Sequence, residues 1–187
     1  MRAPVELAKC YRLLNHGPAT LVTTAYAGQS NVMAASWVMP LDFDSPKVVV
    51  VIDKTTLTRE LVDGSGCFAL NVPPRALAQA TLATGTTSGR SADKFITNKF
   101  STFAVSMINV PLIEGCVGWL ECRVLSEPSV ETKYDLFIGE VLAAWADASI
   151  FLNGRWRFEE SSDRTIHYVA GGQFFATGEP FTVPVLP

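Results

Sequence analysis

Residues 19–39 read ATLVTTAYAGQSNVMAASWVM. β-Branched residues are frequent in the first part of this stretch, and residues 27–30 have the composition of a turn before a second apolar run that reaches Met39. A short turn between two strand-forming runs pairs them as antiparallel neighbours. The stretch therefore predicts a β-hairpin, with one strand at 19–26 and the other at 31–39.

Other strand-forming runs lie further along the chain. Residues 47–52 contain four consecutive valines, which predicts a strand that is buried on both faces. Asn153-Gly154 separates two short apolar runs and is a strong hairpin signal. The remaining predicted strands are 67–72, 112–125 and 134–145.

Helical spacing of apolar residues predicts short helices at 4–14, 56–62, 76–82 and 91–97. Gly64 is expected to stop the second of them, and the Gly, Thr and Ser residues of 84–89 predict a loop. Because strands outnumber helices and follow one another by hairpins, the pattern predicts a mainly β fold, an antiparallel barrel with inserted helices. The length of 187 residues suits one domain, which we expect to span 1–187.

The composition is apolar for a chain of this size, with 48% hydrophobic and 18% charged residues. Soluble monomers rarely expose wide apolar patches, so we expect a second subunit to cover part of the surface. A net charge of −3 without any basic run argues against a nucleic-acid-binding face. Without a signal-peptide core or a run long enough for a transmembrane helix, we expect a soluble cytoplasmic protein that does not bind membranes.

The sequence lacks the motifs of several common catalytic and binding sites. The two histidines, His16 and His167, have no metal-ligand spacing, so we expect no metal site. Gly64-Ser65-Gly66 is too short for a nucleophile elbow, residues 85–91 do not match a phosphate loop, and no G-x-G-x-x-G is present. The four cysteines form no C-x-x-C pair and are expected to be reduced and buried.

Three polar segments remain as candidates for a binding site. The first is Asn31-Val32-Met33-Ala34-Ala35-Ser36-Trp37, where small residues let a flat ligand approach the backbone and Trp37 offers an aromatic wall. An ordinary hairpin strand with a core tryptophan explains the same residues, and the segment taken alone favours that interpretation.

The second segment is Asp53-Lys54-Thr55-Thr56-Leu57-Thr58, at the predicted start of a helix. One cation and three hydroxyls beside free backbone N–H groups are what a phosphate binds. A plain threonine N-cap beside a solvated lysine is an equally good explanation of this segment alone.

The third segment, Ser88 to Phe95, carries Arg90 and Lys94 four residues apart, so that both could lie on one helical face beside a phosphate. A surface loop with Asp93 as a counter-charge is the commoner meaning of such a cluster. The three segments together favour a binding site over the structural explanations. A strand for a flat ligand, a hydroxyl-rich helix start and a cationic loop are what flavin mononucleotide (FMN) needs.

The chain resembles the flavin reductase-like family with the FMN-binding split-barrel fold, which includes flavoredoxins and related ferric reductases. The resemblance runs from about Gly17 to Pro180. It rests on an ordered series of segments rather than on one motif. These segments are 17–24, 31–37, 54–58, 67–72, 88–90 with 93–95, 120–123, 137–141 and 167–172.

The resemblance implies a homodimer that holds FMN noncovalently at its interface, with the strand 31–37 along the isoalloxazine. It also implies that segments 54–58 and 88–94 hold the phosphate. The residues expected to bind the cofactor are Asn31, Met33, Ala34, Ala35, Ser36, Trp37, Lys54, Thr55, Thr56, Thr58, Ser88, Arg90 and Lys94. Relatives often carry histidine five residues before the glycine that matches Gly139, and this chain has Tyr134 there, which puts a titrating group at that position in doubt.

The function implied is that of an oxidoreductase in which FMN accepts hydride from NADH or NADPH and passes electrons to free flavin, ferric iron or a partner protein. A flavoredoxin-type electron carrier without its own NAD(P)H turnover is the alternative, and a flavin storage or sensing module is a third. We nominate no catalytic acid or base, since the cofactor would carry the chemistry.

Overall fold

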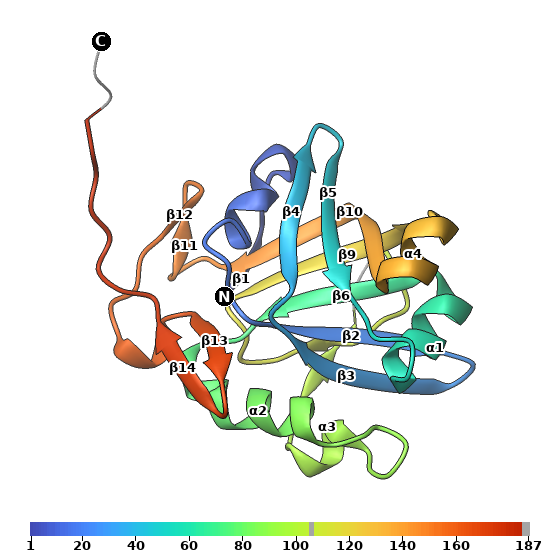
Figure 1. Ribbon diagram of the computed structural model, residues 1–187. Coiled ribbons are helices and arrows are strands. Elements are labelled where there is room, and N and C mark those ends of the chain that lie inside the picture. Colours follow the sequence, from blue (N-terminus) through green and yellow to red (C-terminus); the bar gives the residue numbers. More distant parts are fainter. Residues whose placement is uncertain (105–106, 185–187) are drawn as a thin grey trace.

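The computed structural model describes residues 1–104 and 107–184 and is built on a strongly curved antiparallel sheet (Figure 1). The strand order is β3-β2-β6-β9-β10-β5-β4, and β1 pairs with β10 beside that path. The strands of this sheet are β1 (Arg2–Pro4), β2 (Thr20–Tyr26), β3 (Gln29–Ala35), β4 (Val38–Phe43), β5 (Pro46–Val51), β6 (Cys67–Val72), β9 (Gly118–Leu125) and β10 (Leu136–Asp147). The mainly β fold with inserted helices that the sequence predicts is confirmed.

The two edge strands of this sheet, β3 and β4, are consecutive in the chain. Only Ser36 and Trp37 lie between them, so the end of β3 and the start of β4 are at most about 11 Å apart. No β-ladder joins these two strands in the described part of the chain. The sheet therefore curls into a barrel that stays open along the seam between β3 and β4.

The barrel core and a second apolar cluster occupy opposite faces of the same strands. Val22, Leu70 and Leu120 belong to the larger cluster inside the barrel, whereas Leu21 and Trp119 belong to the other. This alternation follows from the two-residue period of a strand. The outer cluster is covered by the segment that carries β7 (Thr102–Phe103) and β8 (Leu112–Ile113).

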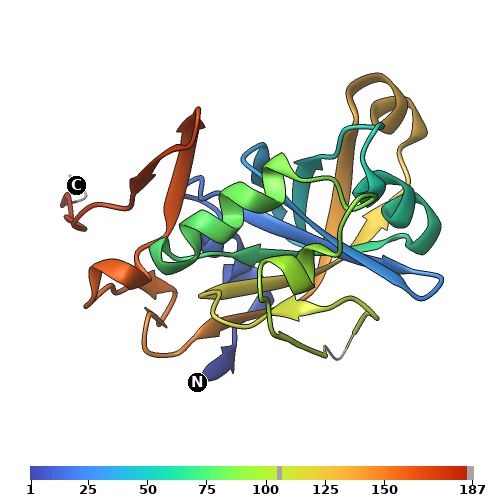
Figure 2. The same cartoon turned by 90° about the horizontal axis from the view of Figure 1, so that it is seen from below.

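In residues 1–104 and 107–184, four α-helices are inserted between the strands. They are α1 (Leu57–Ser65), α2 (Ala78–Thr86), α3 (Lys94–Thr97) and α4 (Pro128–Tyr134). Helix α1 packs on β2 and β3, and α2 and α3 pack on β3. Viewed from below, α2 crosses the sheet beside β3 (Figure 2). None of the helices in the described residues has the length and apolar character of a membrane span.

The structure corrects several predicted strands. The run 31–39 is not one strand, because β3 ends at Ala35 and β4 begins after the seam. The valine-rich strand β5 is not buried on both faces: Val48 and Val50 are buried, and Val49 and Val51 are half-buried. The run 112–125 divides into β8 and β9 around a turn at Gly115, whose φ of 82° suits glycine.

The predicted helices are also corrected. The opening helix is the 3₁₀-helix η1 (Leu7–Leu13), and it follows β1. Helix α1 continues past Gly64 and ends at Gly66 in the left-handed conformation, which a glycine adopts without strain. The third predicted helix is η2 (Arg75–Leu77) followed by α2, which extends into the predicted loop 84–89. Helix α3 begins only at Lys94, so Arg90 and Lys94 do not share a helical face.

Two small hairpins follow β10. The predicted turn at Asn153-Gly154 joins β11 (Phe151–Leu152) to β12 (Arg155–Trp156), and both turn residues have positive φ, as a type I′ turn requires. The second hairpin, β13 (Ile166–Ala170) and β14 (Gln173–Ala176), and the 3₁₀-helix η3 (Ser161–Asp163) were not predicted. All four cysteines are free thiols, as expected, but Cys67 is only half-buried.

Candidate functional site

A polar cavity of about 320 Å³ lies where the start of α1, strand β3 and the end of α2 meet. Its walls are formed by Asn31, Met33, Ala34, Thr55, Thr56, Leu57, Thr58, Thr84, Gly85, Thr86, Thr87, Ser88, Gly89 and Lys94. These residues come from all three polar segments selected in the sequence. The fold therefore brings those segments together.

An aromatic cavity of about 180 Å³ adjoins the polar cavity, between the end of β3, helix α2 and the hairpin β13–β14. Its walls are formed by Ala19, Ala34, Ala35, Ser36, Thr81, Leu82, Gly85, Thr86, Tyr168 and Phe174. Both cavities share Ala34, Gly85 and Thr86. A Cβ at Gly85 would lie 3.5 Å from the Ala34 Cβ, so these two residues lie against each other and form the floor of the junction between the cavities, which we call the neck.

Lys94 places a buried cation in the wall of the polar cavity. The residue is 5% exposed, and its Nζ donates a hydrogen bond of 2.8 Å to the carbonyl of Thr84. No carboxylate of the described residues forms an ion pair with it. Desolvation lowers the pKa of Lys94 from its usual range. A buried ammonium without a counter-charge is costly, and an anion in the cavity would relieve that cost.

The start of α1 presents backbone N–H groups to the same cavity, whereas the hydroxyls of Thr55 and Thr56 donate to Asp53. Thr56 is the N-cap, and its hydroxyl accepts from the backbone N–H of Arg59. Thr55, Thr56, Leu57 and Thr58 all line the cavity at this positive end of the helix dipole. The charge and the dipole therefore both favour an anion here.

Asn31 closes the floor of the polar cavity. Its Nδ2 donates a hydrogen bond of 2.9 Å to the hydroxyl of Thr58, and both residues are buried. Gly89 lies directly against it, because a Cβ at that position would come within 2.2 Å of Asn31 Oδ1. A larger residue at 89 would push Asn31 away from Thr58.

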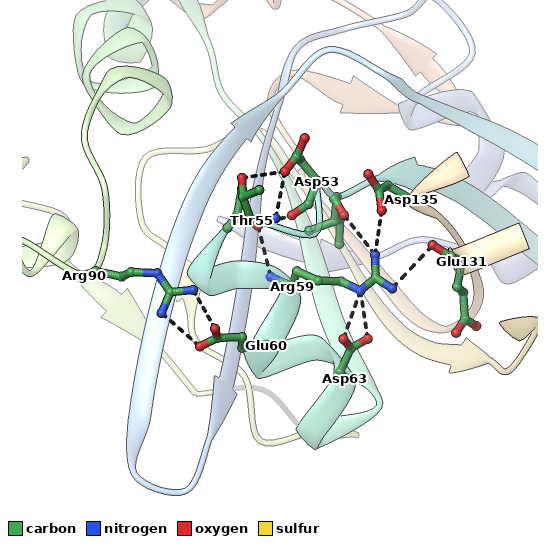
Figure 3. A network of polar contacts seen from close by, with 10 residues as sticks. Asp53, Thr55, Arg59, Glu60, Asp63, Arg90, Glu131 and Asp135 are labelled. Carbon is green, nitrogen blue, oxygen red and sulfur yellow. Dashed lines mark hydrogen bonds and ion pairs between the residues drawn. The ribbon is translucent and has the colours of Figure 1, made fainter. Parts of the chain in front are cut away.

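Two arginine clusters hold α1 in place from opposite sides (Figure 3). Arg90 forms a bidentate ion pair with Glu60, at 2.6 and 3.1 Å, which ties the segment after α2 to α1. Arg59 makes hydrogen bonds with the carboxylates of Asp63 and Asp135 and with the backbone carbonyl of Glu131. Its guanidinium also lies 4.6 Å from the ring centroid of Phe137. Arg59 therefore fixes α1 against α4 and β10.

Replacing Arg59 with methionine is expected to lower the free energy of unfolding by about 2 kcal/mol, because its side chain is only 12% exposed and Asp135 would lose a close partner. Replacing Arg90 with methionine is the matched control. That arginine and Glu60 are about half exposed, so a clearly smaller loss is expected. Urea denaturation of both variants measures the difference. Equal losses of unfolding free energy would contradict the inference that Arg59 fixes α1 against α4 and β10.

A family model described as the flavin reductase like domain matches residues 12–160. The chain belongs to the flavin reductase-like family. The crystal structure of an FMN-binding domain of a flavin reductases-like enzyme from Shewanella baltica is 45% identical, with a TM-score of 0.96 over 98% of each chain. The uncharacterized protein YddH of Escherichia coli is 40% identical over 96% of both chains. Flavoredoxin of Desulfovibrio vulgaris shares the fold, with 21% identity and a TM-score of 0.78 over 89% of this chain and 90% of that one.

The split-barrel fold of the flavin reductase-like family, implied by the resemblance, is therefore confirmed. Most of the residues that this resemblance selected line the two cavities. Asn31, Met33, Ala34, Thr55, Thr56, Thr58, Ser88 and Lys94 line the polar cavity, and Ala34, Ala35 and Ser36 line the aromatic one.

Three selected residues lie outside these walls. Lys54 is exposed and makes no ion pair within the described part of the chain. Arg90 is held by Glu60, on the α1 side of its loop. Trp37 is 74% exposed at the seam, so the interpretation of Trp37 as a core residue is wrong.

The sequence did not reveal the wall that faces β3. Thr84, Gly85 and Thr86 belong to the end of α2, which the sequence predicts as a loop, and Thr81 lies in the predicted helix 76–82. Tyr168 and Phe174 come from the unpredicted hairpin. Its signal was present in the sequence: Gly171-Gly172 separates two short runs that contain aromatic residues.

Tyr134 occupies the last position of α4, just before β10, and its side chain is 59% exposed. It lines neither cavity. Within one subunit, this structure gives Tyr134 no contact with the candidate site.

Proposed function

We propose that the two adjoining cavities bind FMN, with its phosphate in the polar cavity and its isoalloxazine against residues 34–36 in the aromatic cavity. The observation that carries the proposal is Lys94, a buried cation without a carboxylate partner among the described residues, in a cavity at the start of α1. A phosphate is the anion that this arrangement suits, because the backbone N–H groups of a helix start and a buried cation converge there.

The neck supports the same ligand. Ala34 and Gly85 present almost no side chain at the junction of the two cavities, so a slender chain such as ribityl can run from one cavity to the other along their surface. The apolar residues beyond the neck suit a flat ring, and the polar atoms before it suit a phosphate. Shape and charge thus change along the site in the same order as they change along FMN.

The activity we propose is the NAD(P)H-dependent reduction of flavin, with electrons passed to free flavin, ferric iron or a partner protein. When bound, FMN supplies the hydride-accepting and electron-transferring chemistry. The chain holds the phosphate with Lys94 and the α1 donors, orients the ring against β3 and shields one part of it with Tyr168 and Phe174. None of the cavity residues is proposed as a catalytic acid or base.

Anaerobic stopped-flow mixing of the FMN-loaded protein with NADH and with NADPH tests the activity. Rapid bleaching of the visible flavin band is expected with at least one of the two. A protein that binds FMN but is not bleached by either would be the electron carrier, and the reductase activity would be excluded.

We also propose a homodimer with the flavin at its interface. Trp37, Met39, Leu41 and Phe43 alternate along the edge strand β4 and its seam, and each is between 48% and 74% exposed. This apolar row begins directly after Ser36 of the aromatic cavity and is the kind of surface that an obligate interface covers. Light scattering is expected to give twice the chain mass of 20.3 kDa. A stable, FMN-loaded monomer would contradict the dimer.

A further inference from the structure

The hairpin β13–β14 forms the outer wall of the aromatic cavity but does not belong to the barrel sheet. Tyr168 and Phe174 pair across it, with their ring centroids 5.2 Å apart, and both rings line the cavity. The position of this wall therefore depends on how the hairpin is attached to the barrel.

The base of the hairpin is attached by a backbone hydrogen bond of 2.7 Å from the Ala19 N–H to the Ile166 carbonyl and by a chain of polar side chains. His16 Nε2 lies 2.8 Å from the hydroxyl of Thr165, and this hydroxyl lies 2.5 Å from that of Thr177. The Thr177 hydroxyl lies 3.1 Å from His167 Nε2, and His167 Nδ1 lies 3.0 Å from the carbonyl of Gly17. The chain thus starts and ends on neighbouring residues of the segment before β2.

Only one direction of donation satisfies every atom in this chain when both histidines are neutral. The Gly17 carbonyl can only accept, so His167 Nδ1 carries the proton and His167 Nε2 accepts from Thr177. Thr177 then accepts from Thr165, and Thr165 accepts from His16 Nε2. The direction is assigned from the donor and acceptor inventory and predicts which atoms carry protons.

His16 is suited to the neutral form that this chain requires. Its ring packs edge-on against Trp156 and His167, at 5.5 and 5.6 Å between centroids. Its Nδ1 is buried without a hydrogen-bond partner among the described residues, which favours a bare lone pair over an N–H group. Burial is the main cause that lowers the pKa of His16 to about 4, so the ring is uncharged at neutral pH.

We propose that His16, Thr165, Thr177 and His167 form a hydrogen-bonded latch that positions the Tyr168–Phe174 wall of the aromatic cavity. These four are positioning residues, because they act on the ring site only through the hairpin. This inference rests on the proposed function for the identity of the ring ligand. The attachment of the hairpin itself does not depend on it.

Thr177→Val and Thr177→Ser form a matched pair that tests the latch. Valine keeps the shape of threonine and removes the hydroxyl, whereas serine keeps the hydroxyl. Chymotryptic cleavage after Tyr168, Phe174 and Phe175, measured without flavin, is expected to speed up about fivefold in Thr177→Val and to stay near wild type in Thr177→Ser. His16→Leu and His16→Gln give a second pair, because glutamine keeps a donor near the Nε2 position.

The ring-positioning role is tested by the affinities of the same variants for FMN and riboflavin. Thr177→Val is expected to lower the affinities for FMN and riboflavin by a similar factor, about three- to tenfold, because both ligands use the ring site. A loss restricted to FMN, or unchanged affinity for both with faster cleavage, would overturn the positioning role alone. A wild-type protein that binds neither flavin would overturn the proposed function as well.

Discussion

Replacing Lys94 with methionine is expected to weaken FMN binding by roughly 10- to 150-fold and to leave riboflavin binding nearly unchanged. Methionine has a similar length and no charge, so the change removes the cation and keeps most of the packing. A hydrogen bond to a charged group contributes about 1.5–3 kcal/mol, which sets the size of the loss. Flavin fluorescence titrations with both ligands measure it.

The stability of the protein without flavin separates this effect from a damaged fold. Because Lys94 is buried and has no carboxylate partner in the described residues, Lys94→Met is expected to leave the melting temperature unchanged or to raise it. Lys54→Met is the control, since Lys54 is exposed and outside both cavities. If Lys54→Met weakens FMN binding as much as Lys94→Met does, the phosphate binds at the outer surface of the 54–58 segment and not in the polar cavity.

The lowered pKa of Lys94 gives the same site a pH dependence. FMN affinity is expected to fall as the pH rises through this pKa, below the usual 10.5, because the neutral amine no longer attracts the phosphate. Stability without flavin changes in the opposite sense: between the folded pKa and 10.5 the unfolded chain binds more protons, so stability rises with pH. Riboflavin affinity measured over the same range is the control and is expected to stay flat.

Replacing Gly85 with leucine is expected to weaken the binding of both FMN and riboflavin by more than about 100-fold. A Cβ at residue 85 would lie against Ala34 at the neck, so a leucine side chain would extend over the junction of the two cavities. Excluding the ring from an apolar wall removes about 3 kcal/mol of burial, which corresponds to that factor. The equal loss for both ligands distinguishes a blocked neck from a weakened phosphate site.

Gly85→Ala provides the matched control. A Cβ here makes ordinary contact at 3.5 Å and the residue has helical backbone, so alanine is expected to fit and to stabilise α2 by about 1 kcal/mol. Its flavin affinities should stay within a few-fold of wild type. If Gly85→Leu folds and binds FMN as the wild type does, the ligand does not pass between the two cavities.

The parts of the fold that were predictable depend on local patterns. The hairpin at 19–35 and the turn at Asn153-Gly154 each bring their own strand and turn residues, so a short window of sequence was enough. The division of the run 31–39 was not local. It arises because Ser36 and Trp37 cross from one edge of the curled sheet to the other, and only the curvature of the whole sheet determines that crossing.

The same distinction holds for the candidate site. The residue types that suit a phosphate could be found from composition, but which cation faces the cavity could not. Lys54 and Lys94 are equivalent in sequence terms, and packing alone decides that Lys94 is buried and Lys54 exposed. The position of Arg90 outside the cavity could not be predicted for a similar reason, because its partner Glu60 lies on another element, 30 residues away.

A crystal structure of the protein with FMN tests the central claim most directly. The account predicts a phosphate oxygen about 2.7–3.2 Å from Lys94 Nζ, with the isoalloxazine beyond the neck, against residues 34–36 and beside Tyr168. A phosphate held outside the polar cavity by Lys54 or Arg90, with Lys94 Nζ bound only to the Thr84 carbonyl, would contradict it.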